Sequence, residues 1–164
     1  MSVGHRVDSD HQLARLLQIG VVLEEVVEAR SYHHYQSLDD EPTLDAEIEA
    51  LLEGAAEESA DHRERLETLI SALDAESIPF EEIEALVEAQ YGGTEPEDFD
   101  DILYDQLCNE ETAYKFYDDL IGALRASDAT FGIDRDHLID VLVEIREEEA
   151  EGVEEVTKVM ENRS

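Results

Sequence analysis

The chain has 164 residues, of which 42% are hydrophobic, and its 45 acidic against 11 basic residues give a net charge of −34. A chain of this length forms one domain that buries roughly 70% of its unfolded surface, and it is too hydrophobic for a disordered polyanion. The charge repels nucleic acids and anionic membranes, so we expect neither as a partner.

The acidic residues are spread along the whole chain rather than gathered in one tail. At ordinary ionic strength their mutual repulsion weakens the compact state. At about 1 M salt the screening length falls to about 3 Å, and most of this repulsion disappears. We therefore expect a halophilic protein from a cytosol of the haloarchaeal type, in preference to an acidic binding tail.

Residues 1–10 contain no apolar core of the kind that a signal peptide needs. The longest apolar run, residues 19–23, is too short to span a bilayer. Cys108 is the only cysteine, which excludes an internal disulfide and a CxxC pair, and we expect it to be a small buried residue. These features indicate a soluble cytoplasmic protein.

The predicted helices begin and end at residues that cap or interrupt helices. The first begins at about Ser9 or Asp10, and after it, in "SLDDEPT", Asp39 or Asp40 is a candidate cap and Pro42 suits the first turn of the second. A short helix follows "SIPF" and ends at Gly92 and Gly93. The chain is then free to start a second pair of long helices.

The second pair has its own capping signals. Thr94 and Glu97 have the spacing of a capping box, and Asp134 caps the last helix after "ASDATFGI". The predicted helices span about residues 9–36, 43–73, 79–91, 95–125 and 134–160. A long helix, a turn and a long helix thus occur twice, which predicts an all-α four-helix bundle over residues 1–164 with one extra short helix.

In the second helix an apolar stripe with steps of four and three residues contains a histidine near its middle. The stripe comprises Ile48, Leu52, Ala55, Ser59, His62, Leu66, Leu69 and Leu73. An inward histidine is more often a hydrogen-bonded core residue than a metal ligand, so both interpretations of His62 stay open at this point.

Carboxylates fall on the stripes of the other long helices at similar heights. Glu149 lies on the stripe of the last helix and Glu110 on that of the fourth, while Glu28 is inward or at the edge on the first. Buried carboxylates need a cation or a proton in compensation, and iron or manganese often supplies it in helix bundles. Alternatively, in so acidic a chain, these glutamates fall on the stripes by chance and reach solvent.

Two copies of the pattern Glu-x-x-(small)-x-x-x-Tyr occur in equivalent helices. They are "EARSYHHY", with Glu28, Ser31 and Tyr35, and "EETAYKFY", with Glu110, Ala113 and Tyr117. The chain in this respect resembles ferritin-like, and specifically rubrerythrin-like, di-iron carboxylate proteins, over about residues 10–160. In that family two helices each give a Glu and two give a Glu-x-x-His pair, all facing inward.

The chain departs from the family's pattern in both Glu-x-x-His pairs. Ser59 stands where the glutamate before His62 is expected, and Gly152 where a histidine after Glu149 is expected. The resemblance then leaves Glu28, His62, Glu110 and Glu149 as metal ligands, with Glu58 able to turn in as a further candidate. Such a set suits one iron or manganese ion and would hold two poorly.

The resemblance implies a homodimer that reduces peroxide or oxidises ferrous ion. Its electrons would come from an external donor, because one cysteine leaves no rubredoxin module. Tyr35 and Tyr117 would lie near the centre as hydrogen-bonding or radical-quenching groups, or simply pack in the core. The alternative, which Ser59 and Gly152 favour, is a metal-poor or metal-free bundle that serves as a binding or scaffold module.

Overall fold

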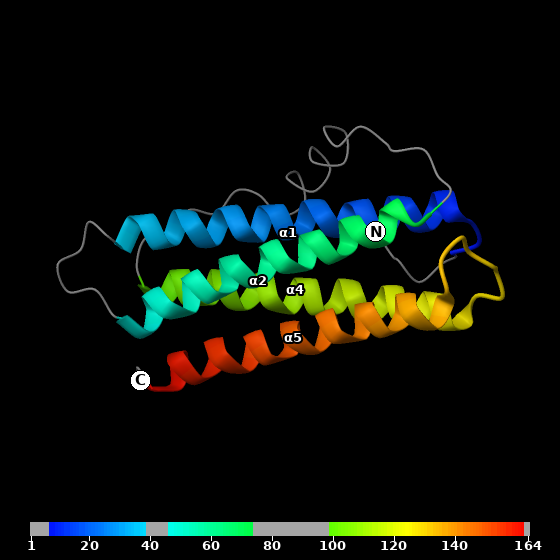
Figure 1. Ribbon diagram of the computed structural model, residues 1–164. Helices are drawn as coiled ribbons and strands as arrows, with labels where there is room; N and C mark the ends of the chain where they lie inside the picture. Colours follow the sequence, from blue (N-terminus) through cyan, green and yellow to red (C-terminus); the bar gives the residue numbers. More distant parts are fainter. Residues whose placement is uncertain (1–6, 39–45, 74–98, 163–164) are drawn as a thin grey trace.

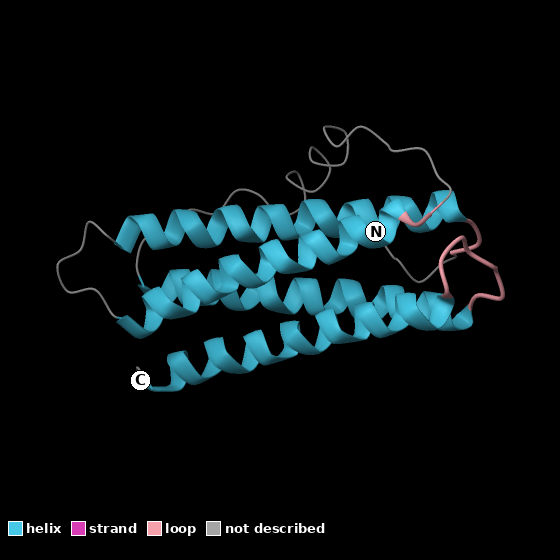
Figure 2. Cartoon of the chain, in the orientation of Figure 1, coloured by secondary structure: helices cyan, strands magenta, loops and turns pink. Residues whose placement is uncertain are grey.

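The computed structural model describes residues 7–38, 46–73 and 99–162, and leaves the side chains of 32–38 and 99–101 undescribed. This part of the chain contains four helices and no strand (Figure 2). They are α1 (Asp10–Leu38), α2 (Ala46–Ser71), α4 (Phe99–Ala126) and α5 (Arg135–Asn162) (Figure 1). The four long predicted helices are confirmed, whereas the short helix predicted at 79–91 lies outside the described residues.

The four helices form a bundle in which each helix contacts two neighbours (Figure 1). The consecutive pairs α1–α2 and α4–α5 are antiparallel, and α2 packs on α5 as α1 packs on α4. All four neighbouring pairs are therefore antiparallel. Because α2 and α4 run in the same direction, the end of α2 and the start of α4 lie at opposite ends of the bundle.

Side-chain caps begin α1 and α5, and the cap of α5 is the one that the sequence predicts. The Ser9 hydroxyl accepts a 3.2 Å hydrogen bond from the backbone N–H of Gln12, whose Oε1 accepts one of 2.7 Å from the N–H of Asp8. At the other helix, Asp134 Oδ1 accepts from the N–H of Asp136 at 3.4 Å. These bonds satisfy amide groups that the first turn of a helix leaves free.

The core consists of two apolar clusters with buried polar residues between them. The larger cluster draws on α1, α2, α4 and α5 and extends to the loop at residue 131, and the smaller draws on α2, α4 and α5 at the opposite end of the bundle. On α2, α4 and α5 the buried polar residues fall between members of the two clusters. We call this set the polar layer: Glu24, Ser59, His62, Gln106, Glu110 and Glu149.

The predicted stripes agree closely with the observed burial. Every predicted stripe residue of α4 and α5 is buried, and in α2 the one exception is Ala55, whose neighbour Ala56 takes the inward position. The expectation that Cys108 is buried is wrong, since its side chain is exposed. It lies between the inward positions Gln106 and Glu110, on the opposite side of the helix.

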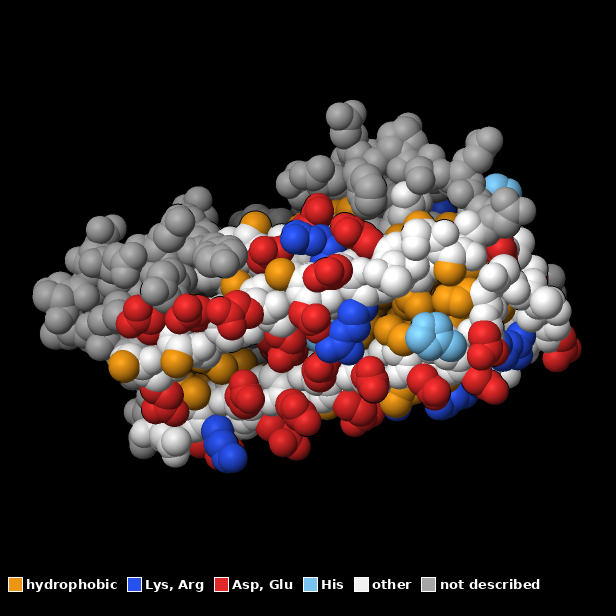
Figure 3. Space-filling view, viewed as in Figure 1, with side chains coloured by type: hydrophobic (Ala, Val, Ile, Leu, Met, Phe, Trp, Pro, Cys, Tyr) orange, Lys and Arg blue, Asp and Glu red, His pale blue; other side chains and the backbone are white. Residues whose placement is uncertain are grey.

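An arginine–carboxylate ion pair bridges each of the four neighbouring helix pairs. The shortest N–O distances are 2.7 Å for Arg63–Glu28 (α2–α1), 2.6 Å for Arg30–Asp105 (α1–α4), 3.0 Å for Arg65–Glu148 (α2–α5) and 2.9 Å for Arg146–Asp118 (α5–α4). Acidic side chains cover much of the face formed by α2 and α5 (Figure 3). None of the described helices is apolar over enough of its length to cross a membrane.

Candidate metal centre

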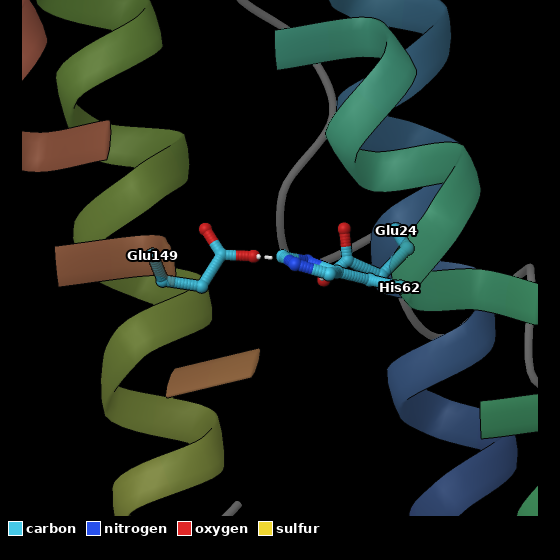
Figure 4. Close-up of side chains that lie close together, drawn as sticks. All are labelled: Glu24, His62 and Glu149. Atoms are coloured by element: carbon cyan, nitrogen blue, oxygen red, sulfur yellow. Dashed lines mark hydrogen bonds and ion pairs between the residues drawn. The ribbon is translucent and has the colours of Figure 1, made fainter. Parts of the chain in front are cut away.

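The imidazole of His62 lies at the centre of the polar layer, between carboxylates of two other helices (Figure 4). Its Nδ1 is 3.3 Å from Oε1 of Glu24 in α1 and 3.0 Å from Oε1 of Glu149 in α5. All three side chains are buried, and their donor atoms lie within 4.8 Å of one another. This is the spacing that a single metal ion requires of three ligands.

A close contact at Gly20 lies one turn from the level of Glu24 and His62. A Cβ atom on Gly20 would lie 3.1 Å from Leu66 Cδ1 and 3.1 Å from a ring carbon of Phe116, so a larger residue would require these side chains to shift. Because α1 and α2 are antiparallel, one turn forward from Gly20 reaches Glu24, and one turn back from Leu66 reaches His62. The two residues therefore meet at the same height.

The second ring nitrogen of His62 faces the surface. Its Nε2 is 2.9 Å from Oε2 of Glu148, which also accepts 3.0 Å hydrogen bonds from Arg65. Arg65 in turn donates to Asp61 at 2.6 Å. If a metal ion displaced the proton of Nδ1, Glu148 would keep the proton on Nε2, so Nδ1 is the ring atom that could bind an ion in the layer.

Glu24 is held by a buried hydroxyl on one oxygen only. The Tyr117 hydroxyl donates a 2.6 Å hydrogen bond to Oε1, and both residues are fully buried. Burial, together with the charge of Glu24, raises the pKa of Tyr117 well above its usual range, so Tyr117 stays a donor. The other oxygen, Oε2, is buried without a hydrogen-bond partner.

A second group of carboxylates extends from Glu149 towards α4. Glu58, Glu110 and Glu149 place carboxyl oxygens within 4.8 Å of one another, and Glu110 and Glu149 form a hydrogen bond when one of the two holds a proton. Oε1 of Glu110 also accepts a 3.1 Å hydrogen bond from Gln106 Nε2, and Oε1 of Gln106 accepts one of 3.1 Å from the Ser31 hydroxyl. A buried polar chain thus runs from α1 through α4 to α5.

Gly152 makes room for Glu110. A Cβ atom at position 152 would lie 2.5 Å from Oε2 and 2.7 Å from Cδ of Glu110, closer than such atoms can approach. The carboxylate of Glu110 therefore occupies the space that any side chain at 152 would fill. Any other residue at this position would require the carboxyl group of Glu110 to move.

Burial raises the pKa of three carboxyl groups in or beside the layer, those of Glu58, Glu110 and Glu149. Burial, and next the charge of Glu110, raises the pKa of Glu58 to about 8. Burial also raises the pKa of Glu110, and it raises that of Glu149 well above the usual range, with help from the charge of Glu24. Protons therefore compensate part of the buried negative charge when no cation does so.

His62 is cationic for a related reason. Burial by itself lowers the pKa of its imidazole, but the hydrogen bond and negative charge of Glu24 and the hydrogen bond to Glu148 outweigh burial and raise the pKa to about 9. The protonated ring donates from both nitrogens. A metal ion at Nδ1 would take the place of one of these protons.

Of the ligands predicted from the sequence, His62, Glu110, Glu149 and Glu58 lie in or beside the polar layer. Glu28 does not join them, because its carboxylate is partly exposed and pairs with Arg63. Glu24, one turn earlier, lies beside His62 instead, and it was not among the candidate ligands predicted from the sequence. The side chain of Tyr35 lies outside the described residues.

The hydrogen bonds also show which residues of the two halves correspond. Tyr117, seven residues after Glu110, reaches across to Glu24, and Ser31, seven residues after Glu24, reaches Gln106 and through it Glu110. The repeat is thus in register when Glu24, not Glu28, is aligned with Glu110. In both helices a residue with a hydroxyl group follows the glutamate by seven positions, Ser31 after Glu24 and Tyr117 after Glu110. This spacing could have identified Glu24 from the sequence.

Comparisons with protein-family models, with curated proteins and with solved structures find no match for this chain. The function of the chain is therefore inferred from the geometry of the polar layer.

Proposed function

We propose that the polar layer binds one divalent metal ion, iron or manganese, through Glu24, Nδ1 of His62 and Glu149. Two carboxylates and one imidazole are donors that suit these metals. The observation that carries the proposal is Oε2 of Glu24, a fully buried carboxylate oxygen without a hydrogen-bond partner. Leaving such an oxygen unpaired is costly, and a cation between Glu24, His62 and Glu149 would compensate it.

The contacts of His62 support this assignment. Nδ1 faces the two buried carboxylates, and Glu148 accepts from Nε2 on the surface side. A carboxylate on the far nitrogen orients a metal-binding imidazole and increases its basicity. Arg65, which bridges Glu148 and Asp61, holds that carboxylate in place.

We further propose that the bundle belongs to the ferritin-like class and acts on reduced oxygen species or ferrous ion. Three features support this: the four helices have antiparallel neighbours, α2 and α4 run in the same direction, and the polar layer lies between the two apolar clusters. A bound iron or manganese ion would supply one-electron chemistry, with electrons from an external donor. The protein's own contribution is to exclude water with two apolar clusters and to hold Glu24 through Tyr117.

One observation favours the alternative of a metal-free scaffold. The raised pKa values of Glu58, at about 8, and His62, at about 9, together with that of Glu149, mean that protons alone can neutralise much of the layer. A bundle with this network could fold without a metal ion. In that case the unpaired oxygen of Glu24 is a tolerated cost.

Titration of the metal-free protein with Mn²⁺ in molar KCl distinguishes the two functions. Electron paramagnetic resonance of free Mn²⁺ gives the number of ions bound and their affinity. We expect one ion per chain, and a loss of about 100-fold or more in affinity for Glu24→Gln and for His62→Gln. Glu28→Gln is the matched control, since Glu28 is one turn away and pairs with Arg63, and it should leave the affinity unchanged.

Two results would contradict the proposal in different ways. The Glu24→Gln/His62→Gln double variant measures how much Mn²⁺ the surface carboxylates bind. If the wild type binds no more than this variant does, the metal-free scaffold is favoured. Loss of affinity in Glu28→Gln with retention in Glu24→Gln would restore the ligand set expected from the sequence.

A further inference from the structure

We infer that Glu110 is not a metal ligand but a positioning residue that orients Glu149, so that the polar layer holds one ion and not two. This inference rests on the proposed metal site and assigns a role to the α4 half of the layer. Three observations support it: the hydrogen-bond partners of Glu110, the space beside Gly152 that its carboxyl group fills, and the residue types of the group Glu58, Glu110 and Glu149.

The carboxyl group of Glu110 contacts Gln106 of its own helix and Glu149 and Gly152 of α5. Oε1 accepts from Gln106 Nε2 at 3.1 Å, the group is hydrogen-bonded to Glu149, and its face rests on Gly152, where a Cβ atom would be only 2.5 Å from Oε2. Binding a metal ion would require Glu110 to leave at least one of these partners. Glu24, by contrast, has a buried oxygen without a hydrogen-bond partner.

The chain that holds Glu110 is buried along its whole length. The exposed fractions are 0% for Ser31, 0% for Gln106, 5% for Glu110 and 3% for Glu149. Each link is a side-chain hydrogen bond, and the chain connects α1, α4 and α5. A buried network with its members satisfied adopts one arrangement, since breaking any link leaves an unpaired buried group.

This chain acts on the metal site through Glu149. Oε1 of Glu149 is 3.0 Å from Nδ1 of His62, and Glu110 holds the same carboxyl group from the α4 side. Without Glu110, the side chain of Glu149 would be free to adopt other rotamers, and ordering it again would weaken metal binding. Partners that orient ligands in this way are worth about 10–100-fold in metal affinity.

The second carboxylate group differs from the first in having no imidazole and no carboxylate of its own beyond Glu58 and Glu110. Glu58, Glu110 and Glu149 supply only carboxylates, Glu149 is shared with the first site, and Gly152 contributes no donor atom. A single ion on the side of Glu24 and His62 is therefore the arrangement that keeps every hydrogen bond of Glu110.

The test compares Glu110→Gln, Glu110→Ala and Gln106→Leu with the wild type by Mn²⁺ titration and by the resonance spectrum of the bound ion. A glutamine at 110 can still accept from Gln106 and donate to Glu149, so its affinity should stay near that of the wild type. The alanine variant should bind about 10–100-fold more weakly, with one ion and an unchanged spectrum. Gln106→Leu leaves Glu110 present and should fall between the two.

Three results would overturn the inference: Glu110→Gln as weak as Glu24→Gln, a second bound ion with a spin-coupled spectrum, or Glu110→Ala as tight as the wild type. If the alanine variant does not fold, as judged by circular dichroism, Gln106→Leu carries the same comparison. Failure of the proposed metal site itself would look different, because the wild type and all three variants would then show no binding.

Discussion

The hydroxyl of Tyr117 in α4 donates a 2.6 Å hydrogen bond to Oε1 of Glu24 in α1, with both side chains fully buried. Tyr117→Phe removes this donor and leaves a buried carboxylate with His62 as the remaining partner of Oε1. We expect a loss of about 1–3 kcal/mol in the free energy of unfolding, measured by denaturant titration of the metal-free protein. Tyr114→Phe, on an exposed tyrosine of the same helix, should change it little.

The stability of the metal-free protein should fall as the pH rises. The pKa of His62 is about 9 in the folded state and near 6.5 in the unfolded chain, so its contribution is complete below pH 6.5 and is lost as the pH passes 9. For this fully buried group the loss is about 3 kcal/mol at most. Glu58, with a pKa raised from 4.5 to about 8, acts in the same direction, because the folded state binds its proton more tightly.

Unfolding experiments at constant molar KCl on both sides of this range measure the effect. His62→Gln should give a flatter dependence of stability on pH than the wild type does. Metal-bound protein should show the reverse trend, since the ion competes with protons for Nδ1 and the carboxylates. A wild-type curve that rises from pH 6.5 to 9 in the absence of metal would contradict the assigned protonation of His62.

Salt should stabilise the fold strongly. The net charge is −34, and raising the salt from about 0.1 M to about 1 M shortens the screening length from about 10 Å to about 3 Å. We expect the melting temperature to increase over this range, and to do so equally in KCl and in tetramethylammonium chloride, if screening is the cause. An increase in KCl alone would instead indicate specific binding of potassium to the acidic surface.

Gly152→Ala should destabilise the bundle although alanine favours helix. The new Cβ would lie 2.5 Å from Glu110 Oε2, so Glu110 must leave its seat, at a cost of about 1–3 kcal/mol. Gly54 and Gly122 are helical glycines with nothing within 4 Å of an added Cβ. Alanine at either control position should stabilise by about 0.5–1 kcal/mol, measured in the same denaturant titration.

Much of the fold could be predicted because it depends on local regularities. Caps at Ser9 and Asp134 mark the starts of α1 and α5, and the stripes in α2, α4 and α5 follow the 3.6-residue period of the helix. A helix with one apolar stripe buries that stripe whatever its partner is. The inward positions of His62, Glu110 and Glu149 were therefore predictable before any contact was known.

The helix α1 was harder to interpret, because two neighbouring stripes on it are about equally apolar. Glu24 and Glu28 are one turn apart, and the period alone does not say which of them meets His62. The predicted repeat aligned Glu28 with Glu110, since both precede a small residue and a tyrosine. The hydrogen bond from Tyr117 to Glu24 corrects that alignment.

The amino-acid sequence by itself determined four amphipathic helices, an acidic surface and a buried polar position in the middle of each stripe, because these depend on composition and on the period of a helix. Only the tertiary structure decided which polar groups meet. Axial offset between helices depends on how their surfaces interlock, and here the close contact of Gly20 with Leu66 lies one turn from the level of Glu24 and His62. The contact of Glu110 in α4 with Gly152 in α5 likewise joins two helices, so the pattern of one helix alone cannot predict it.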